Sequence, residues 1–414
     1  MKYIVIGAGS RGSIYGSWAH ANGIEIAAVA ELRPDRLEEA GKLWNVPPEM
    51  RFLKVSELFA LGKIADAAII ATMDRDHFGH VMAALDCGYD ILLEKPISPD
   101  PKECLAIEEK ANRLGRKITV CHVLRYTNFF GAIKDIIDSG ELGKIVAIKH
   151  SENIGNFHMA HSFVRGNWRN DSLSSPIIMQ KSCHDLDILL WLTGAHCTKV
   201  AAFGSLSYFK ESNAPAGSAD RCVNCPVAAP CRFESKKCYL PTLGSWPTDV
   251  VCLEQTQEAL FAALETGPYG RCVYRCDNNV CDHMSIIMEF DNDVTATFSL
   301  TAQTSSCNRN IHIMMEDGEI IADDGQRRIL VRKHVSSNAD TFEERIVNIR
   351  TNASGHGGGD AGIMEDFTAS LSAHSETRSA ISASVESHLM ACAIEKSRFT
   401  GKVVTIADFK KELQ

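Results

Sequence analysis

The chain has 414 residues, of which 45% are hydrophobic and 23% charged, and its net charge is −9. Without a Lys/Arg-rich run, such an acidic chain is a poor partner for nucleic acid or an anionic membrane. Single hydrophobic cores stop growing at about 250–300 residues, so the length predicts two or three domains. The apolar run at residues 3–6 is too short for a signal peptide, and no stretch has the roughly 20 apolar residues of a membrane helix. We therefore expect a cytoplasmic protein.

The first part of the chain alternates short apolar runs with amphipathic stretches such as residues 33–44 and 78–87. The strand-like runs lie at residues 3–6, 24–30, 67–71, 91–94 and 117–120. Strands that alternate with helices of this length indicate βαβ units and a parallel sheet. We predict an α/β domain of the Rossmann type over residues 1–122.

From residue 123 the pattern changes to a helix at 128–139 and then to strands that follow one another. These strands are expected at residues 145–150, 197–207, 284–290, 294–301, 311–315 and 329–333. Consecutive strands without intervening helices indicate an antiparallel sheet. We predict a C-terminal α+β domain over residues 123–414, with a large, mostly antiparallel sheet, a Cys-rich insert at about 210–245 and closing helices at 361–372 and 382–397.

Both alternating sets of positions in the strands at 197–207, 284–290 and 294–301 carry apolar residues. A sheet that is apolar on both faces needs two partners, because large exposed apolar patches are rare on monomers. We therefore expect a homodimer or homotetramer with this sheet in the interface.

A glycine pattern follows the first predicted strand and opens a helical segment. Gly7, Gly9 and Gly12 form G-x-G-x-x-G, in which the glycines allow a tight turn, close approach of a pyrophosphate, and packing of helix on strand. Glu31 ends the second strand, where a carboxylate can bond both ribose hydroxyls of NAD and would repel a 2′-phosphate. Arg33 lies nearby and would tolerate NADP, so NAD is the preferred but not the exclusive expectation.

Several later motifs carry a resemblance to a known family. The turn Glu94-Lys95-Pro96 closes the fourth strand of the Rossmann half, and "HDLDILLWL" begins at His184. Together with the N-terminal glycines, Thr72 and His77, these motifs resemble the Gfo/Idh/MocA family of glucose–fructose oxidoreductase and inositol dehydrogenase. The resemblance covers the whole chain except the Cys-rich insert.

The resemblance implies that Lys95 lies beside the nicotinamide and the substrate hydroxyl. A lysine beside a positively charged ring gives up its proton more readily and can then assist removal of the alcohol proton. In relatives the Lys–Pro bond is often cis. The implied cofactor contacts are Gly7, Gly9, Ser10, Arg11, Gly12, Glu31, Thr72, His77, Glu94 and Lys95. For His77, a helix-start residue satisfied by backbone groups is an equal alternative.

A second catalytic segment runs from Gln180 to Asp187. In the family an aspartate usually stands four residues before a histidine and another three residues after it; His184 and Asp187 match these positions. His184 is the expected general acid/base, because an unperturbed imidazole titrates near neutrality. Gln180 replaces the first aspartate, and Lys181 is expected to supply a second amine or a positive charge for an anionic substrate group.

Candidate substrate residues come from two unusual segments. The stretch before Trp168-Arg169 is rich in His, Asn and aromatic residues, which suits carbohydrate, and "HGGGD" near the C-terminus resembles an element of some family branches, including a glycosidase branch. A plain turn with Asp360 as helix N-cap is the alternative for the second segment. The full set is Arg125, His158, His161, Arg165, Trp168, Arg169, His356 and Asp360.

The insert contains Cys222, Cys225, Cys231 and Cys238 in the spacing C-x2-C-x5-C-x6-C. Four thiolates can complete a closed, structural zinc site, and an iron–sulfur cluster uses the same ligands. Four thiols without metal are the main competing interpretation.

The function expected from these features is NAD(P)-dependent hydride transfer between the carbinol carbon of a carbohydrate or polyol and nicotinamide. One alternative is an NAD-dependent glycosidase that oxidises a sugar transiently, eliminates the aglycone and returns the hydride. Another is a non-catalytic, NAD-sensing regulator, against which the presence of Lys95, His184 and Asp187 argues.

Overall fold

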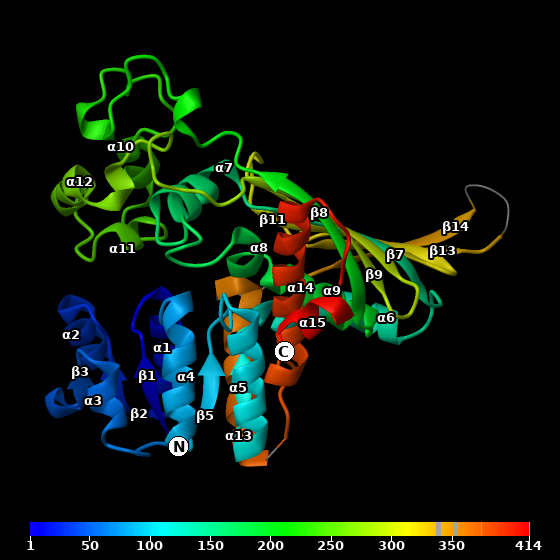
Figure 1. Cartoon of the computed structure of the whole chain (residues 1–414), viewed down its shortest axis with the longest axis horizontal. Helices are drawn as coiled ribbons and strands as arrows, with labels where there is room; N and C mark the ends of the chain where they lie inside the picture. Colours follow the sequence, from blue (N-terminus) through cyan, green and yellow to red (C-terminus); the bar gives the residue numbers. More distant parts are fainter. Residues whose placement is uncertain (337–340, 351–354, 374, 414) are drawn as a thin grey trace.

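The computed structural model describes residues 1–336, 341–350, 355–373 and 375–413. Figure 1 shows two sheet-containing halves and a group of short helices, α10 to α12, set apart from both. The two sheets have six and nine strands. The architecture is therefore α/β in the N-terminal half and α+β in the C-terminal half, which confirms the predicted fold class.

The six-stranded sheet has the order β3-β2-β1-β4-β5-β6, and all its pairs are parallel. Its strands are β1 (Lys2–Ile6), β2 (Glu25–Ala30), β3 (Arg51–Phe52), β4 (Ala67–Ile70), β5 (Asp90–Leu93) and β6 (Ile118–Val120). Strands buried on both faces read as continuous apolar runs, which explains why five of these strands are visible in the sequence. The edge strand β3 has only two residues and was not predicted.

Helices cover both faces of this sheet. They are α1 (Ser10–Ala21), α2 (Pro34–Leu43), α3 (Val55–Phe59), α4 (His77–Asp86) and α5 (Pro101–Leu114). The chain returns to this half near its end, because Phe367 of α13 (Gly359–Ala373) packs with its ring 5.9 Å from that of Tyr3 in β1. The C-terminal residues therefore contribute to the core of the dinucleotide-binding half.

The nine-stranded sheet has the order β14-β13-β12-β11-β7-β10-β9-β8-β15. Its strands are β7 (Ile145–Asn153), β8 (Cys197–Ser205), β9 (His283–Phe290), β10 (Thr295–Thr301), β11 (Asn308–Met315), β12 (Gly318–Asp323), β13 (Arg328–His334), β14 (Phe342–Asn348) and β15 (Val404–Thr405). Its neighbouring strands are antiparallel except for the parallel pair β7 and β10. The expectation of a mostly antiparallel sheet is confirmed.

One face of this sheet packs against helices, and the other is open. The helices of this half are α6 (Asn128–Asp138), α8 (Ile177–Gln180), α9 (Cys183–Thr193), α14 (Ile381–Thr400) and α15 (Ile406–Leu413). Along β9, residues alternate strictly between exposed and buried, and Ile286, Met288 and Phe290 all lie on the buried face. The open face also carries apolar residues, as expected, but they alternate with polar ones: Ile287 lies there between Ser285 and Glu289, because strand residues two apart share a face.

The segment expected to be a His- and Asn-rich loop is largely helical. It forms the short helix α7 (Asn156–His158) and a π-helix from Met159 to Arg165, all of whose residues are buried. The insert contains α10 (Ser235–Tyr239) and is followed by α11 (Thr248–Val251) and α12 (Gln257–Thr266). None of the helices in the described part of the chain combines the length and apolarity that a membrane crossing requires.

Candidate active site

The glycine turn between β1 and α1 has the geometry that the sequence pattern predicts. Gly7 has φ +87°, and a Cβ there would lie 2.5 Å from the carbonyl oxygen of Ala71. A side chain at Gly12 would collide with the carbonyl of Gly7, whereas no atom lies within 4 Å of a Cβ built at Gly9. The backbone is thus open at the residue that precedes the free N–H groups of α1, which suits a bound pyrophosphate.

Glu31 lies directly beside this turn. Its Oε2 accepts a hydrogen bond from the backbone N–H of Ala8 at 2.7 Å, and its Oε1 accepts one from Arg33 N–H at 3.0 Å. The side chain of Arg33 forms an ion pair with Asp35 at 2.6 Å. The carboxylate at the end of β2 is therefore fixed next to the open backbone, as the cofactor interpretation requires.

Glu94 is a buried carboxylate at the end of β5. It accepts hydrogen bonds from Arg11 Nε and Tyr15 Oη, both at 2.7 Å, and from the backbone N–H of Lys95 at 2.9 Å. Burial acts to raise the pKa of Glu94, but the positive charges of Arg11 and Lys95 outweigh it and the pKa lies below its usual value. Glu94 is therefore an ionised group that holds Arg11 in place.

Arg11 also binds the C-terminal "HGGGD" segment. Its guanidinium contacts both oxygens of Asp360, at 2.6 and 3.1 Å, and Asp360 lies 3.2 Å from Nδ1 of His356. The Asp360 side chain is 4% exposed, so its negative charge is buried and is balanced by the Arg11 guanidinium. This segment is therefore more than a plain turn: its contacts with Arg11 tie the dinucleotide-binding half to the start of α13.

Lys95 projects from the end of β5 toward the C-terminal half. Its ammonium donates a hydrogen bond to the carbonyl oxygen of Gln180, the last residue of α8, at 2.7 Å. The Lys95–Pro96 bond is cis. His77 bridges two carbonyl oxygens, Pro96 at 2.7 Å through Nδ1 and Thr72 at 3.2 Å through Nε2. Both ring nitrogens of His77 are thus engaged by backbone groups, and the residue positions the turn that carries Lys95.

His184 lies in the first turn of α9, four residues after the Gln180 carbonyl that Lys95 binds. Its Nδ1 is buried without a hydrogen-bond partner, and its ring centroid is 5.6 Å from that of His122. Burial, followed by the positive charge of Lys95 and by His122, lowers the pKa of His184 well below its usual value. The imidazole is therefore neutral near pH 7 and available to accept a proton.

The surroundings of Asp187 differ from those expected from the sequence motif. Its two oxygens each lie 2.7 Å from the guanidinium of Arg125, one against Nε and one against Nη2, and the carboxylate is fully buried. Arg125 also donates to the carbonyl of Arg378 at 2.7 Å. The expected catalytic role of Asp187 and substrate role of Arg125 are corrected here, because the two charges neutralise each other inside the protein.

Lys181 belongs to a second buried charge network. Its ammonium lies 3.1 Å from Glu152, whose carboxylate also pairs with Arg309 at 2.7 Å. Arg309 pairs in turn with Asp185 at 2.8 Å, and Asp185 accepts from His150 at 2.8 Å. The charge of Lys181 is therefore already balanced by Glu152, which weakens the expectation that it binds an anionic substrate group.

The substrate candidates before α8 separate into two groups. Burial and then the charge of Lys181 lower the pKa of His158 well below its usual value, and its ring packs against that of Trp246 with centroids 5.1 Å apart. The carbonyl of Trp168 accepts a hydrogen bond from the Gln180 amide at 3.0 Å, and its indole N–H donates to Asp74 at 3.4 Å. Trp168 therefore lies at the boundary between the two halves of the chain.

The other three candidates of this segment are engaged by the insert or by the residues that follow it. His161 Nδ1 lies 3.1 Å from Tyr239 Oη, and its ring stacks on that of Tyr269 with centroids 4.7 Å apart. Arg165 is buried and donates to the carbonyls of Phe233 and Arg271, and Arg169 pairs with Asp277 at 2.7 Å. These contacts hold the insert and the segment after it in place and give no support to a substrate role.

All fifteen cysteines are free thiols. Within the described residues, no group of three or more His, Cys, Asp or Glu side chains is arranged to hold a metal ion. The predicted zinc site of Cys222, Cys225, Cys231 and Cys238 is therefore not supported in that form.

The comparison with protein families follows the two halves of the structure. Residues 1–122 match the Gfo/Idh/MocA model described as "Oxidoreductase family, NAD-binding Rossmann fold". Residues 134–406 match the model of the same family described as "Oxidoreductase family, C-terminal alpha/beta domain". The chain belongs to the Gfo/Idh/MocA oxidoreductase family. The resemblance drawn from the glycine turn and the Lys95 motif is confirmed.

Curated Gfo/Idh/MocA relatives are similar to this chain at moderate identity. The putative oxidoreductase YteT of Bacillus subtilis is 23% identical over 356 residues, which cover 83% of this chain and 82% of the relative. Inositol 2-dehydrogenase of Corynebacterium glutamicum (strain R) is 27% identical over 204 residues, covering 47% of this chain and 55% of the relative. The chain thus spans about half the length of that inositol dehydrogenase.

Solved structures share the fold over nearly the whole chain. Levoglucosan dehydrogenase in complex with NADH has a TM-score of 0.73 at 17% identity, with 98% of this chain and 99% of that chain covered. An oxidoreductase from Agrobacterium radiobacter, in complex with NAD+, L-tartaric acid and magnesium, has a TM-score of 0.70 at 16% identity, with 99% of each chain covered. Both show that the order of the two halves is that of the family fold.

Two parts of the site were missed by the sequence interpretation. His122 follows β6 and has both ring nitrogens buried without partners, and Glu152 and Arg309 complete the network of Lys181. His122 could have been found, because it stands at the carboxyl end of a parallel strand, where ligands of open α/β sheets bind. Glu152 and Arg309 lie on strands far apart in sequence and give no comparable signal.

Proposed function

We propose that this protein is an NAD-dependent dehydrogenase of a carbohydrate or polyol. The observation that carries the proposal is that the Lys95 ammonium, at the carboxyl end of a parallel strand, donates to the Gln180 carbonyl at 2.7 Å, one helical turn before His184 in the other half of the chain. The carboxyl ends of the parallel strands are where open α/β sheets bind their ligands. The residues of the glycine turn fit the pyrophosphate of NAD, and Glu31 fits the adenosine ribose. NAD supplies the hydride acceptor.

In this proposal the two groups divide the work on the substrate hydroxyl. Lys95 is held by the Gln180 carbonyl at 2.7 Å and donates to the hydroxyl oxygen, which stabilises the developing alkoxide. His184 is neutral and takes up the proton. The buried oxygen Oε1 of Gln180 and Nδ1 of His184 have no protein partner, and we propose that substrate hydroxyls satisfy them.

The substrate class rests on two supports. The relatives and structural neighbours include inositol and levoglucosan dehydrogenases. Trp168 accepts a hydrogen bond from the side chain of Gln180, whose carbonyl binds Lys95, and an indole suits the C–H face of a sugar ring.

Incubation of the full chain with NAD and a panel of sugars, polyols and glycosides tests the proposal. We expect NADH to accumulate with at least one sugar or polyol, followed by its near-ultraviolet absorbance. Release of an aglycone without net NADH would replace the dehydrogenase by the redox-neutral glycosidase. Neither signal with any panel member, although NAD binds, would support the regulatory alternative.

The carboxylate of Glu31 predicts a preference for NAD over NADP. The Glu31→Ala variant should bind NAD roughly ten- to a hundred-fold more weakly, since a hydrogen bond to a charged group contributes about 1.5–3 kcal/mol. NADP affinity should change little or rise. Fluorescence titration of both cofactors measures the effect, with Glu25→Ala at the opposite end of β2 as the control. An unchanged ratio of the two affinities would remove Glu31 from the ribose site.

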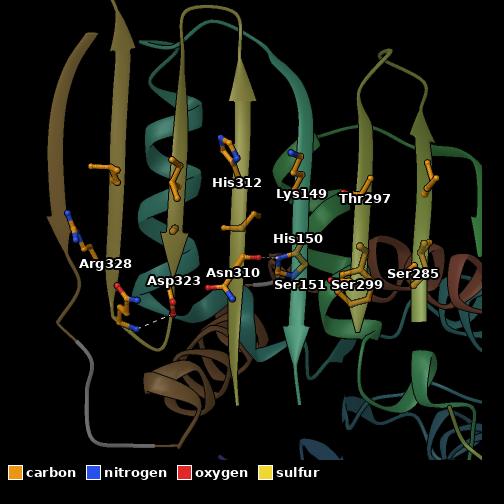
Figure 2. A pocket seen from close by; sticks show the side chains of 18 residues that line it. Lys149, His150, Ser151, Ser285, Thr297, Ser299, Asn310, His312, Asp323 and Arg328 are labelled. Atoms are coloured by element: carbon orange, nitrogen blue, oxygen red, sulfur yellow. Dashed lines mark hydrogen bonds between the residues drawn. The ribbon is translucent and has the colours of Figure 1, made fainter. Parts of the chain in front are cut away.

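We also propose that the protein is a homodimer or homotetramer joined through the open face of the nine-stranded sheet. Figure 2 shows this hollowed face, where Lys149, Thr297 and His312 project from neighbouring strands. Its apolar members include Ile321 and Leu330 together with Phe203 and Ile287, of which the last two are 74% and 60% exposed. Large side chains with that exposure, on a face rimmed by polar groups, suit contact with a second subunit.

Light scattering should give a mass that is two or four times that of the 45.4 kDa chain. The Ile287→Glu variant should shift the mass toward the monomer, because an unpaired charge is placed inside the interface. The Phe399→Glu variant changes a 71%-exposed side chain on α14 instead and should leave the mass unaltered. A monomeric wild-type chain would refute the proposed assembly.

A further inference from the structure

Four cysteine thiols surround one small cavity beneath the insert, remote from Lys95 and His184. We name it the thiol cavity. The cysteines that line it are Cys222, Cys225, Cys231 and Cys272. Three of them belong to the motif recognised in the sequence, but the fourth lies far along the chain and replaces Cys238.

Backbone pairing brings the distant cysteine into place. Arg221 and Arg271 form an isolated antiparallel bridge, and the N–H of Cys272 donates to the carbonyl of Asp220 at 2.8 Å. This pairing sets Cys272 beside Cys222. The sulfur of Cys238 lies instead 3.7 Å from the carbonyl oxygen of Arg232 and is not part of the cavity wall.

The other thiols are placed by consecutive tight turns. The N–H of Cys225 donates to the carbonyl of Cys222 at 3.2 Å, and the N–H of Cys231 donates to Ala228 at 3.0 Å. The chain therefore curls around the cavity and presents two sulfurs from the first turn and one from the second. This is how a C-x-x-C segment offers two thiolates to a metal.

A buried positive charge at the cavity wall is the second observation. Arg165 is 1% exposed, and its guanidinium donates to the carbonyls of Arg271 and Phe233, both at 2.7 Å, and to the sulfur of Cys222 at 3.5 Å. In the described part of the chain no carboxylate pairs with it within 4 Å. A buried cation needs a compensating negative charge, and ionised thiolates would supply it.

We propose that Cys222, Cys225, Cys231 and Cys272 bind a metal centre through their thiolates. Each thiol releases its proton to solvent as its metal–sulfur bond forms, and the resulting anionic centre balances Arg165. Thiolate ligands select zinc or an iron–sulfur cluster. In the described residues these side chains are not arranged to hold an ion as they stand, so binding requires the four thiols around the cavity to turn inward.

The centre has a structural role in this proposal. The helices after the insert have a small apolar core of their own, formed by Tyr239, Leu260, Leu264 and Tyr269. A metal centre at the thiol cavity ties the segment around Cys222 to the segment around Cys272. Four protein ligands leave no open position, so we assign it no part in hydride transfer.

Elemental analysis and spectroscopy of the full chain, purified without chelator and without oxygen, test the proposal. We expect about one zinc ion per chain, or iron with acid-labile sulfide and visible charge-transfer absorbance; either result supports the centre and identifies it. A chain that stays free of both metals, even after anaerobic reconstitution with zinc or with iron and sulfide, overturns the proposal.

Matched variants test which four thiols bind. Cys272→Ser should lose most of the metal, whereas Cys238→Ser, in the same insert, should retain it; the reverse result would overturn the assignment. Thiol alkylation of the wild-type chain, read by mass spectrometry, needs no variant. The four thiols should be protected together and become reactive together when the metal is removed, with exposed Cys307 labelled throughout. Independent labelling of the four would contradict a shared centre.

Discussion

The Lys95→Ala variant is expected to lose kcat by a factor of roughly 10²–10³, the usual contribution of a donor that stabilises a developing oxyanion. The reason is geometric: the ammonium reaches from the end of β5 across to the Gln180 carbonyl at 2.7 Å, one helical turn before His184. The glycine turn and Glu31 are separate from this side chain, so the dissociation constant of NAD should change little. Steady-state kinetics and a fluorescence titration of NAD measure the two quantities.

The control for Lys95 is Lys102→Ala, which removes an exposed lysine at the start of α5 in the same half of the chain. It should leave both kcat and NAD affinity unchanged. Near-normal kcat in Lys95→Ala would show that Lys95 does not stabilise the alkoxide. Loss of turnover in Lys181→Ala, with Lys95→Ala active, would then assign that role to Lys181.

The Asp187→Ala variant is expected to destabilise the fold by about 3–5 kcal/mol, the typical cost of leaving one partner of a buried ion pair alone. Its carboxylate holds the Arg125 guanidinium through two contacts of 2.7 Å, and both side chains are buried. Urea unfolding followed by circular dichroism measures the change. Asp408→Ala breaks an exposed pair with Lys411 and should have little effect.

A double variant separates a structural role from a catalytic one. Replacing both partners with apolar residues, as in Arg125→Met with Asp187→Leu, should recover much of the lost stability, because no unpaired charge remains. If Asp187 were instead a catalytic acid, Asp187→Ala would be nearly as stable as the wild type and would lose turnover. That result would restore the role expected from the sequence motif.

The dinucleotide-binding half was predictable because its signals are local. Buried parallel strands such as β4 are continuous apolar runs, and the glycine turn after β1 has a fixed spacing. Of the strands that were missed, β3 and β15 have two residues each and β14 is almost entirely exposed. The fourth, β12, alternates between buried and half-buried residues and was overlooked. The open face of the large sheet is more polar than expected, because apolar residues such as Ile287 stand there between polar ones.

The site was predictable only where a motif places a residue by itself. Lys95, Glu94 and Glu31 occupy strand ends, so their neighbourhood follows from the sheet. The partner of Asp187 is Arg125, which the sequence gives no means of pairing with it. The fourth thiol of the thiol cavity was mispredicted for the same reason. The spacing in the sequence pointed to Cys238, whereas a backbone bridge between distant segments places Cys272 beside the other three cysteines.

The central claim is that this chain moves a hydride from a carbinol carbon of a carbohydrate or polyol to NAD. The most direct measurement uses the panel substrate that yields NADH, prepared with deuterium on the carbon that is oxidised, and follows the label by mass spectrometry. The account predicts that the deuterium appears in the nicotinamide ring of the NADH formed by the wild-type chain and that this transfer is lost in Lys95→Ala. Deuterium that is released to water, or that stays in the product while no labelled NADH forms, would contradict it.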